Sequence, residues 1–304
     1  MLLYTHPACL AHDAGPGHPE SPSRLQAVLE ALAHEKFAGL DRVEAPRVTR
    51  EQLARAHADA LIEEVFASAP REGYARLDPD TAMSPASLEA AQRAAGAVCA
   101  AVDALLDGKT ARAFCAVRPP GHHATRDTAM GFCLFNNVAI GAAHALARGV
   151  ERVAVVDFDV HHGNGTQDIF WDDPRVLYAS THQWPLYPGT GARSETGAGN
   201  IVNVPLPRGA SGTEFHTAFN DAILPALHRF EPRLVMISAG FDAHRLDPLA
   251  DLNLVAEDYT WVTRELVEIA QKYASGRVVS SLEGGYSLTA LRESAVAHVA
   301  ALLD

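Results

Sequence analysis

Short β-branched runs alternate along this chain with longer Ala- and Leu-rich segments of helical period. This alternation is typical of βα units, in which parallel strands form a sheet and helices cover its two faces. We therefore predict an α/β protein with a three-layer α/β/α fold around a mostly parallel central sheet. The predicted strands are Leu2–Thr5, Ala113–Val117, Arg152–Asp157, Val176–Thr181, Ile201–Pro205, Leu234–Ser238 and Val278–Leu282. The predicted helices are Ser21–His34, Glu51–Ala67, Ser84–Leu106, Asn137–Arg148, Glu214–His228, Ala256–Ala274 and Leu288–Leu303.

The chain is predicted to form one domain that spans residues 1–304. A length of 304 residues divided by ~150 would suggest two domains, but that ratio is only a weak guide. No Pro/Ser-rich linker, charge block or internal repeat divides the sequence. With 48% hydrophobic residues, the chain has enough apolar side chains for one large core.

Charge and cysteine content narrow the classes of function. The chain has 25 Lys and Arg against 37 Asp and Glu, and its net charge of −12 repels a phosphate backbone or an anionic lipid surface. We therefore expect neither nucleic acid nor a membrane as a partner. No signal peptide is recognisable, no apolar run approaches the ~18 residues of a membrane span, and the four cysteines show no C-x-x-C spacing. These features indicate a cytoplasmic protein, and they leave open whether it forms a homo-oligomer.

The densest group of reactive side chains follows the predicted strand Arg152–Asp157, in the segment DFDVHHGNG of residues 157–165. With the period of a strand, Asp157, Asp159 and His161 lie on one side as the strand ends. Such groups are costly to bury unpaired, and a divalent metal would neutralise them. Carboxylate oxygen and imidazole nitrogen are common zinc ligands, so the segment predicts a zinc site better than it predicts helix-capping aspartates beside surface histidines.

A further ligand is expected from the segment SAGFDAH of residues 238–244, where Asp242 follows the predicted strand Leu234–Ser238. A strand-end aspartate is often only a turn or cap residue. In an open parallel sheet, however, ligands bind outside the carboxyl ends of the strands, and Asp242 lies at that same edge. The long irregular segments 118–132 and 183–200 also follow strands, so we expect them to build the site.

Two more segments carry groups suited to acid–base chemistry. RPPGHH at 118–123 presents the adjacent imidazoles of His122 and His123 on a loop that its prolines stiffen. Histidine takes or gives a proton near neutral pH, and its pKa responds to a hydrogen-bonded carboxylate. LEGGY at 282–286 places Tyr286 where its hydroxyl could donate to a developing oxyanion, although such a tyrosine is more often a packing residue.

Together these segments resemble the zinc-dependent histone deacetylase family, which includes bacterial histone-deacetylase-like amidohydrolases and acetylpolyamine amidohydrolases and shares the arginase-like α/β fold. The matching segments stand in the family's order and span most of the chain. They are HPESPSR (18–24), RPPGHH (118–123), GFCLFNN (131–137), DFDVHHGNG (157–165), YPGTG (187–191), SAGFDAH (238–244) and LEGGY (282–286).

The resemblance implies that Asp159, His161 and Asp242 bind one catalytic zinc ion. It implies catalytic roles for His123 as general base, His122 as its partner, Tyr286 as the carbonyl-polarising tyrosine, and Asp157 and Asn164 as hydrogen-bond partners of the two histidines. The expected reaction is hydrolysis of the amide of acyl-lysine, or of a similar acylated amine, to a free amine and a carboxylate.

The resemblance also implies a substrate tunnel and a second ion. The tunnel positions are Gly131, which receives the substrate amide, the walls Phe132 and Tyr187, and Arg24 near the product channel. A structural potassium ion is implied at Asp157 and Ser180, with the backbone of Asp159, His161 and Thr181.

A few positions place the chain within the family. Asn164 and Glu283 stand where class I members carry Asp and Gly, so the chain resembles class II. Tyr187 replaces the usual tunnel phenylalanine. Leu249 stands where polyamine-selective members carry a glutamate, which favours an acyl-lysine over an acetylpolyamine substrate. The alternatives are an acetylpolyamine amidohydrolase, an arginase-like hydrolase with two metal ions, and a non-catalytic binding module that keeps the fold.

Overall fold

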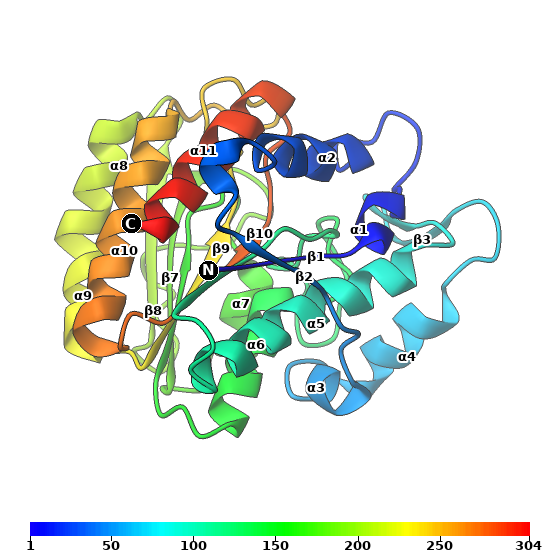
Figure 1. The fold of residues 1–304 in the computed structure, drawn as a ribbon, viewed down its shortest axis with the longest axis horizontal. Helices are drawn as coiled ribbons and strands as arrows, with labels where there is room; N and C mark the ends of the chain where they lie inside the picture. The colour runs from blue at the N-terminus through cyan, green and yellow to red at the C-terminus, as the bar shows by residue number, and fades with distance from the viewer.

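The computed structural model describes residues 1–304 (Figure 1). Its strands are β1 (Leu2–Thr5), β2 (Asp41–Glu44), β3 (Ala75–Asp78), β4 (Thr81–Met83), β5 (Arg112–Cys115), β6 (Val153–Asp157), β7 (Val176–Trp184), β8 (Ile201–Pro207), β9 (Leu234–Ala239) and β10 (Val278–Leu282). Its helices are α1 (Pro7–Ala11), α2 (Pro22–Ala31), η1 (Glu35–Phe37), α3 (Arg50–Ala54), α4 (Asp59–Ala67), α5 (Ser87–Leu106), α6 (Asn137–Ala147), α7 (Asn164–Ile169), α8 (Gly212–Ala218), η2 (Phe219–Ile223), α9 (Leu224–Phe230), α10 (Ala256–Tyr273) and α11 (Leu288–Leu303).

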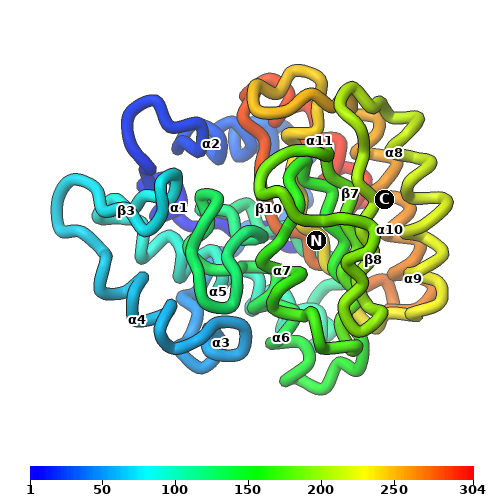
Figure 2. Tube along the Cα trace, turned by 180° about the vertical axis from the view of Figure 1, so that it is seen from behind, coloured from blue at the N-terminus to red at the C-terminus, as the bar shows by residue number.

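Eight strands form one parallel sheet in the order β2-β1-β5-β10-β9-β6-β7-β8, and β3 and β4 form a separate antiparallel hairpin. Helices α5 and α6 pack against the central strands on one face, and α10, α11 and α2 cover the other (Figure 1). Seen from behind, α3 and α4 lie at one side of the molecule and α8, α9 and α10 at the other (Figure 2). This arrangement confirms the predicted three-layer fold.

The central strands are buried on both faces, as expected for a parallel sheet covered by helices. Every residue of β6, β9 and β10 is buried. The sequence predicts these strands because they are nearly continuous apolar runs. None of the helices has the length and apolar character needed to cross a membrane.

Some elements of the structure differ from those predicted from the sequence. Strand β2 was missed because it is an edge strand whose residues are mostly exposed, so it carries no apolar pattern. The predicted helix Glu51–Ala67 is wrong, because α3 and α4 are separate helices and a Thr49–Gln52 capping box begins the first of them. The predicted helix Glu214–His228 is interrupted by the π-helical turn η2, just before Pro225, which has no N–H for the α-helical ladder.

The strand order brings the reactive loops to one edge of the sheet. Strands β5, β10, β9, β6 and β7 are consecutive neighbours. Asp157 at the end of β6 pairs with Ser238 of β9 on one side and with Ser180 of β7 on the other. Because all these strands are parallel, the loops after their carboxyl ends meet above the same edge.

Candidate active site

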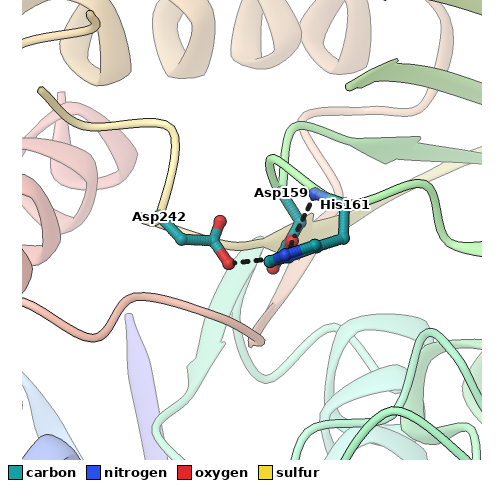
Figure 3. A group of neighbouring side chains, drawn as sticks. All are labelled: Asp159, His161 and Asp242. Atoms are coloured by element: carbon teal, nitrogen blue, oxygen red, sulfur yellow. Dashed lines mark hydrogen bonds and ion pairs between the residues drawn. The ribbon is translucent and has the colours of Figure 1, made fainter. Parts of the chain in front are cut away.

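Asp159, His161 and Asp242 converge at this edge, as the sequence predicted (Figure 3). Each offers one ligand atom, and the three atoms lie within 4.8 Å of one another. His161 Nδ1 is 3.1 Å from Asp159 Oδ1 and 3.2 Å from Asp242 Oδ2. Even so, Asp242 Oδ2 is buried and makes no hydrogen bond. Two buried carboxylates and an imidazole whose ligand atoms lie this close together are a donor set that fits zinc.

The electrostatics of the three side chains also favour a cation. Burial raises the pKa of Asp242 to about 7, and the negative charge of Asp159 adds to this effect. Burial alone would lower the pKa of His161, but Asp159 and Asp242 raise it to about 10. Both shifts arise because two carboxylates are crowded together away from water. A divalent metal would relieve this repulsion.

Backbone groups hold the two carboxylates in place. The N–H of Gly284 donates to Asp159 Oδ2 at 2.8 Å, and the N–H of Val160 donates to Asp242 Oδ1 at 2.9 Å. A Cβ atom at Gly284 would overlap the Asp242 carboxylate, and one at Gly240 would overlap that of Asp159. The close approach of these glycines therefore shapes the ligand site.

Asp157 does not join the cluster, although the strand period placed it on the same side as Asp159 and His161. Strand β6 ends at Asp157, so the period of two does not extend beyond it. Its Oδ2 is 3.0 Å from His122 Nδ1 and accepts from the Tyr178 hydroxyl at 3.1 Å. Asp157 therefore orients a histidine, which is the contact that the family resemblance implies.

The tandem histidines have separate partners and opposite pKa shifts. His123 Nδ1 lies 2.8 Å from Asn164 Oδ1. Burial alone would lower the pKa of His122, but Asp159 and Asp157 raise it to about 10. Burial and the neighbouring His122 hold the pKa of His123 well below its usual value. His123 is thus the neutral imidazole, and its Nδ1–H points to Asn164, which leaves Nε2 able to accept a proton.

A cavity of about 250 Å³ lies beside these groups. Its lining is Asp80, Pro120, His122, His123, Gly131, Phe132, His161, Leu186, Tyr187, Leu249, Gly284 and Tyr286. Burial raises the pKa of Tyr286 well above its usual value, so its hydroxyl keeps its proton and can donate it in a hydrogen bond. Four of the predicted substrate-binding residues, Gly131, Phe132, Tyr187 and Leu249, therefore line one cavity with the reactive groups, whereas Arg24 does not line it.

Residues 18–302 match the family model described as the histone deacetylase domain. The chain belongs to the histone deacetylase family. It is 39% identical to the histone deacetylase-like amidohydrolase of Pseudomonas aeruginosa, over 92% of this chain and 80% of that protein. It is 38% identical to a probable deacetylase of Archaeoglobus fulgidus, over 93% of this chain and 80% of that protein. The crystal structure of the HDA15 HD domain shares the fold with a TM-score of 0.95 at 36% identity, and the match covers 99% of this chain and 87% of that one.

One wall of the deacetylase cavity is strained. Gly131 and Phe132 both have a left-handed backbone, with φ of 58° and 68°. A Cβ atom at Gly131 would overlap the His123 ring, so only glycine fits there. Phe132 adopts the same region despite its side chain, which is costly for a non-glycine residue. This backbone conformation presents the Phe132 ring to the cavity, with its centroid 6.0 Å from that of the Tyr286 ring.

Asp80, which is not among the site residues predicted from the sequence, brings a carboxylate to the deacetylase cavity. Asp80 follows β3, and its N–H donates to Asp78 Oδ1 at 2.8 Å, as in an Asx-turn. Burial and the neighbouring Asp78 raise the pKa of Asp80. In the sequence, this Asp-Pro-Asp turn is indistinguishable from a surface turn, because only the fold of the hairpin brings it to the cavity.

Two residues with implied roles have definite contacts, but those roles stay predictions. Arg24 is fully buried, and it donates to the carbonyl oxygens of Gly285 at 2.5 Å and Glu283 at 2.6 Å. This contact does not test a product channel. Ser180 lies beside Asp157 across two strands, and its hydroxyl is 2.9 Å from His182 Nδ1. The potassium site at Asp157 and Ser180 stays a prediction.

Proposed function

We propose that this deacetylase-family protein uses one zinc ion to hydrolyse the side-chain amide of acyl-lysine residues, with a free amine and a carboxylate as products. The observation that carries the proposal is the ligand triad of Asp159, His161 and Asp242, whose His161 lines a cavity of about 250 Å³. The tandem histidines and Tyr286 line the same cavity. A metal site, a proton acceptor and a hydrogen-bond donor therefore face one reaction volume, as amide hydrolysis requires.

The triad would hold the zinc ion through two carboxylates and one imidazole, which leaves coordination positions for water and substrate. When bound, zinc polarises the amide carbonyl and lowers the pKa of water from ~15.7 towards ~7. An arginase-like binuclear site has less support, because the Asp157 carboxylate is hydrogen-bonded by His122 and Tyr178 outside the triad.

The protein's own groups would handle the proton and the oxyanion. His123, whose Nε2 carries no proton, takes the proton of the attacking water and later gives it to the leaving amine. Asn164 fixes the tautomer of His123 through Nδ1. The Tyr286 hydroxyl donates to the oxygen on which negative charge develops, and such donors are worth on the order of 10²–10³ in rate.

The shape and polarity of the cavity support a substrate with an apolar stem. Phe132, Leu186, Tyr187 and Leu249 contribute apolar surface to its wall. The four methylenes of a lysine side chain would gain roughly 25 cal/mol for each Å² that they bury there. Leu249 offers no charge to attract the cationic chain of a polyamine.

Acetylpolyamines are the second candidate substrate, and Asp80 is the observation that favours them. A carboxylate at the cavity attracts a cationic amine, and the attraction strengthens where water is partly excluded. Asp80 is, however, a single carboxylate on a wall to which Phe132, Leu186, Tyr187 and Leu249 contribute apolar surface. We therefore place acyl-lysine substrates first.

A substrate panel with a metal analysis tests this proposal. Acyl-lysine peptides, acetylspermidine and acetylputrescine are ranked by kcat/KM, and we expect the peptides to rank first. Leu249→Glu should shift the ratio towards the polyamines, and Asp80→Asn should shift it away from them. Asp242→Ala should lose both zinc and activity, because a charged ligand is removed. Preference of the unmodified protein for polyamines over every peptide would overturn the substrate class, and near-normal zinc and turnover in Asp242→Ala would overturn the metal site.

A further inference from the structure

Glu283 is a fully buried carboxylate that the proposed chemistry does not use. Its Oε2 accepts from the backbone N–H of Gly121 at 2.6 Å and of His122 at 3.2 Å. Its Oε1 accepts from the Ser238 hydroxyl at 3.2 Å. Every side-chain hydrogen bond of Glu283 thus comes from a neutral donor, which is an expensive way to keep a carboxylate in a core. The contacts of this carboxylate indicate what it does in the fold.

The loop that carries the tandem histidines depends on this carboxylate. The backbone carbonyl oxygen of His122 accepts from the N–H groups of Gly165 at 3.1 Å and Thr166 at 3.2 Å. For the backbone N–H groups of Gly121 and His122 in the same loop, the Glu283 carboxylate is the only acceptor. Without Glu283, the two buried N–H donors next to the tandem histidines would lose their only acceptor, although Asn137 Nδ2 would still donate to the Pro119 carbonyl at 3.0 Å.

Glu283 itself is held firmly. Its N–H donates to the Ala239 carbonyl at 3.0 Å, and its own carbonyl accepts from Arg24 Nη2 at 2.6 Å. Tyr286 follows three residues later in the same loop. The carboxylate therefore connects a fixed point of the tyrosine loop to the backbone of the histidine loop.

We propose that Glu283 is a positioning residue that fixes the tandem histidines relative to Tyr286. This inference rests on the proposed function, because it concerns the groups assigned to proton transfer and oxyanion stabilisation. His122 meets Asp157 only while its backbone stays in place, and His123 is the next residue. A shift of ~1 Å in such groups costs on the order of 10²-fold in rate, so a small movement of this loop would be visible in kcat.

Substitutions of Glu283 separate this role from a role for its charge. In Glu283→Gln, the amide oxygen still accepts from both N–H groups, and the amide nitrogen donates to the Ser238 hydroxyl, which can also accept. We expect its kcat to stay within about threefold of wild type, because the geometry is kept while the charge is lost. In Glu283→Asp, the side chain is one methylene too short to reach Gly121. We expect its kcat, and that of Glu283→Ala, to fall on the order of 30- to 100-fold with KM nearly unchanged.

Hydrogen exchange of the Gly121 and His122 amides, followed by NMR, gives a readout that does not depend on activity. Protection of both amides should persist in Glu283→Gln and be lost in Glu283→Asp and Glu283→Ala. Zinc content and thermal stability are measured in parallel and should be equal among these variants. Ser281→Ala is the matched control, because this buried hydroxyl two residues earlier has no hydrogen-bond partner. It should match wild type in kcat and in exchange.

The positioning role and a role for the charge of Glu283 predict different outcomes. A Glu283→Gln enzyme as slow as Glu283→Ala would assign the effect to charge and overturn the proposal. Retention of more than half of wild-type kcat in Glu283→Asp, or unchanged amide protection, would overturn it too. If Glu283→Ala does not fold, the comparison of Glu283→Gln with Glu283→Asp still separates a positioning role from a role for the charge. If the wild-type protein hydrolyses no substrate of the panel, the proposed function fails, and the exchange data still report whether Glu283 holds the loop.

Discussion

At the scale of single residues, the hydroxyl of Tyr286 is the donor whose removal should affect only the transition state. Its ring packs against Phe132 and lies under the Arg24 guanidinium, 4.7 Å from the ring centroid, and both contacts survive in Tyr286→Phe. We expect kcat to fall on the order of 10²–10³-fold with KM nearly unchanged. Steady-state kinetics on an acyl-lysine peptide check this. A loss of less than tenfold would show that another group stabilises the oxyanion.

A second prediction at the residue scale concerns His298, which lies deep in the core between Thr263 and Ser280. Burial lowers the pKa of His298 to about 3, whereas in the unfolded chain it titrates near ~6.5. Between these values the unfolded state binds a proton that the folded state does not. Stability should therefore decrease as the pH falls from ~6.5 towards 3.

The variant His298→Leu removes this proton uptake. Between pH 7 and pH 4.5, wild type should lose about 2–3 kcal/mol more unfolding free energy than this variant, as measured by urea titration. The exposed His228→Leu serves as control and should follow wild type. Parallel pH profiles for wild type and His298→Leu would contradict the prediction.

At the scale of elements, one amide joins the segment after α7 to β7 and β8. Asn200 Nδ2 lies 2.8 Å from the Phe170 carbonyl oxygen, 3.1 Å from that of Asp173 and 2.8 Å from that of Val176. Asn200 immediately precedes β8, so this side chain fixes where the last strand of the sheet begins. Its contacts with three carbonyl groups make Asn200 a joint between the segment after α7 and strands β7 and β8, which the sheet already pairs with each other.

Asn200→Ala should therefore destabilise the protein by about 2–4 kcal/mol, because buried carbonyl groups lose their donor. Equilibrium unfolding in urea measures this change. Asn253→Ala is the control, because Asn253 is exposed and its Nδ2 donates to one carbonyl, that of Gly209, at 3.0 Å. Its cost should be below ~1 kcal/mol. Equal costs for the two variants would show that the joint contributes nothing.

At the scale of the whole molecule, the sheet and the site both depend on residues that precede the family match. The match begins at residue 18, but β1 lies inside the sheet between β2 and β5. The buried Arg118 guanidinium also donates to the carbonyl oxygens of Cys9 at 2.9 Å and His12 at 3.0 Å. Arg118 begins the loop of the tandem histidines, so the first residues of the chain support that loop.

A variant that lacks residues 1–17 should not fold, because it loses an interior strand and leaves the Arg118 charge without two acceptors. Circular dichroism and thermal melting should show no cooperative transition. A variant that lacks only the exposed Asp304 should melt as wild type does. Cooperative melting of the shorter chain would mean that the domain is complete without β1.

The parallel sheet, the order of the motif loops and the chemical type of the donors at the candidate metal site can be predicted from the sequence. These are local properties: buried strands are continuous apolar runs, and Asp159 and His161 are close in sequence. Local pattern failed where burial was absent, as at β2, and where strand geometry ended, as at Asp157.

Which distant groups meet depends on the three-dimensional fold. It brought Asp242 to His161, Asp80 to the cavity wall, and the Glu283 carboxylate to the backbone of Gly121. These contacts depend on strand order and on the paths of loops, and a linear sequence encodes them only through the packing energy of the whole core. The sequence therefore specifies the groups available for chemistry, and the parallel sheet, by gathering the ends of its strands at one edge, determines which of them act together.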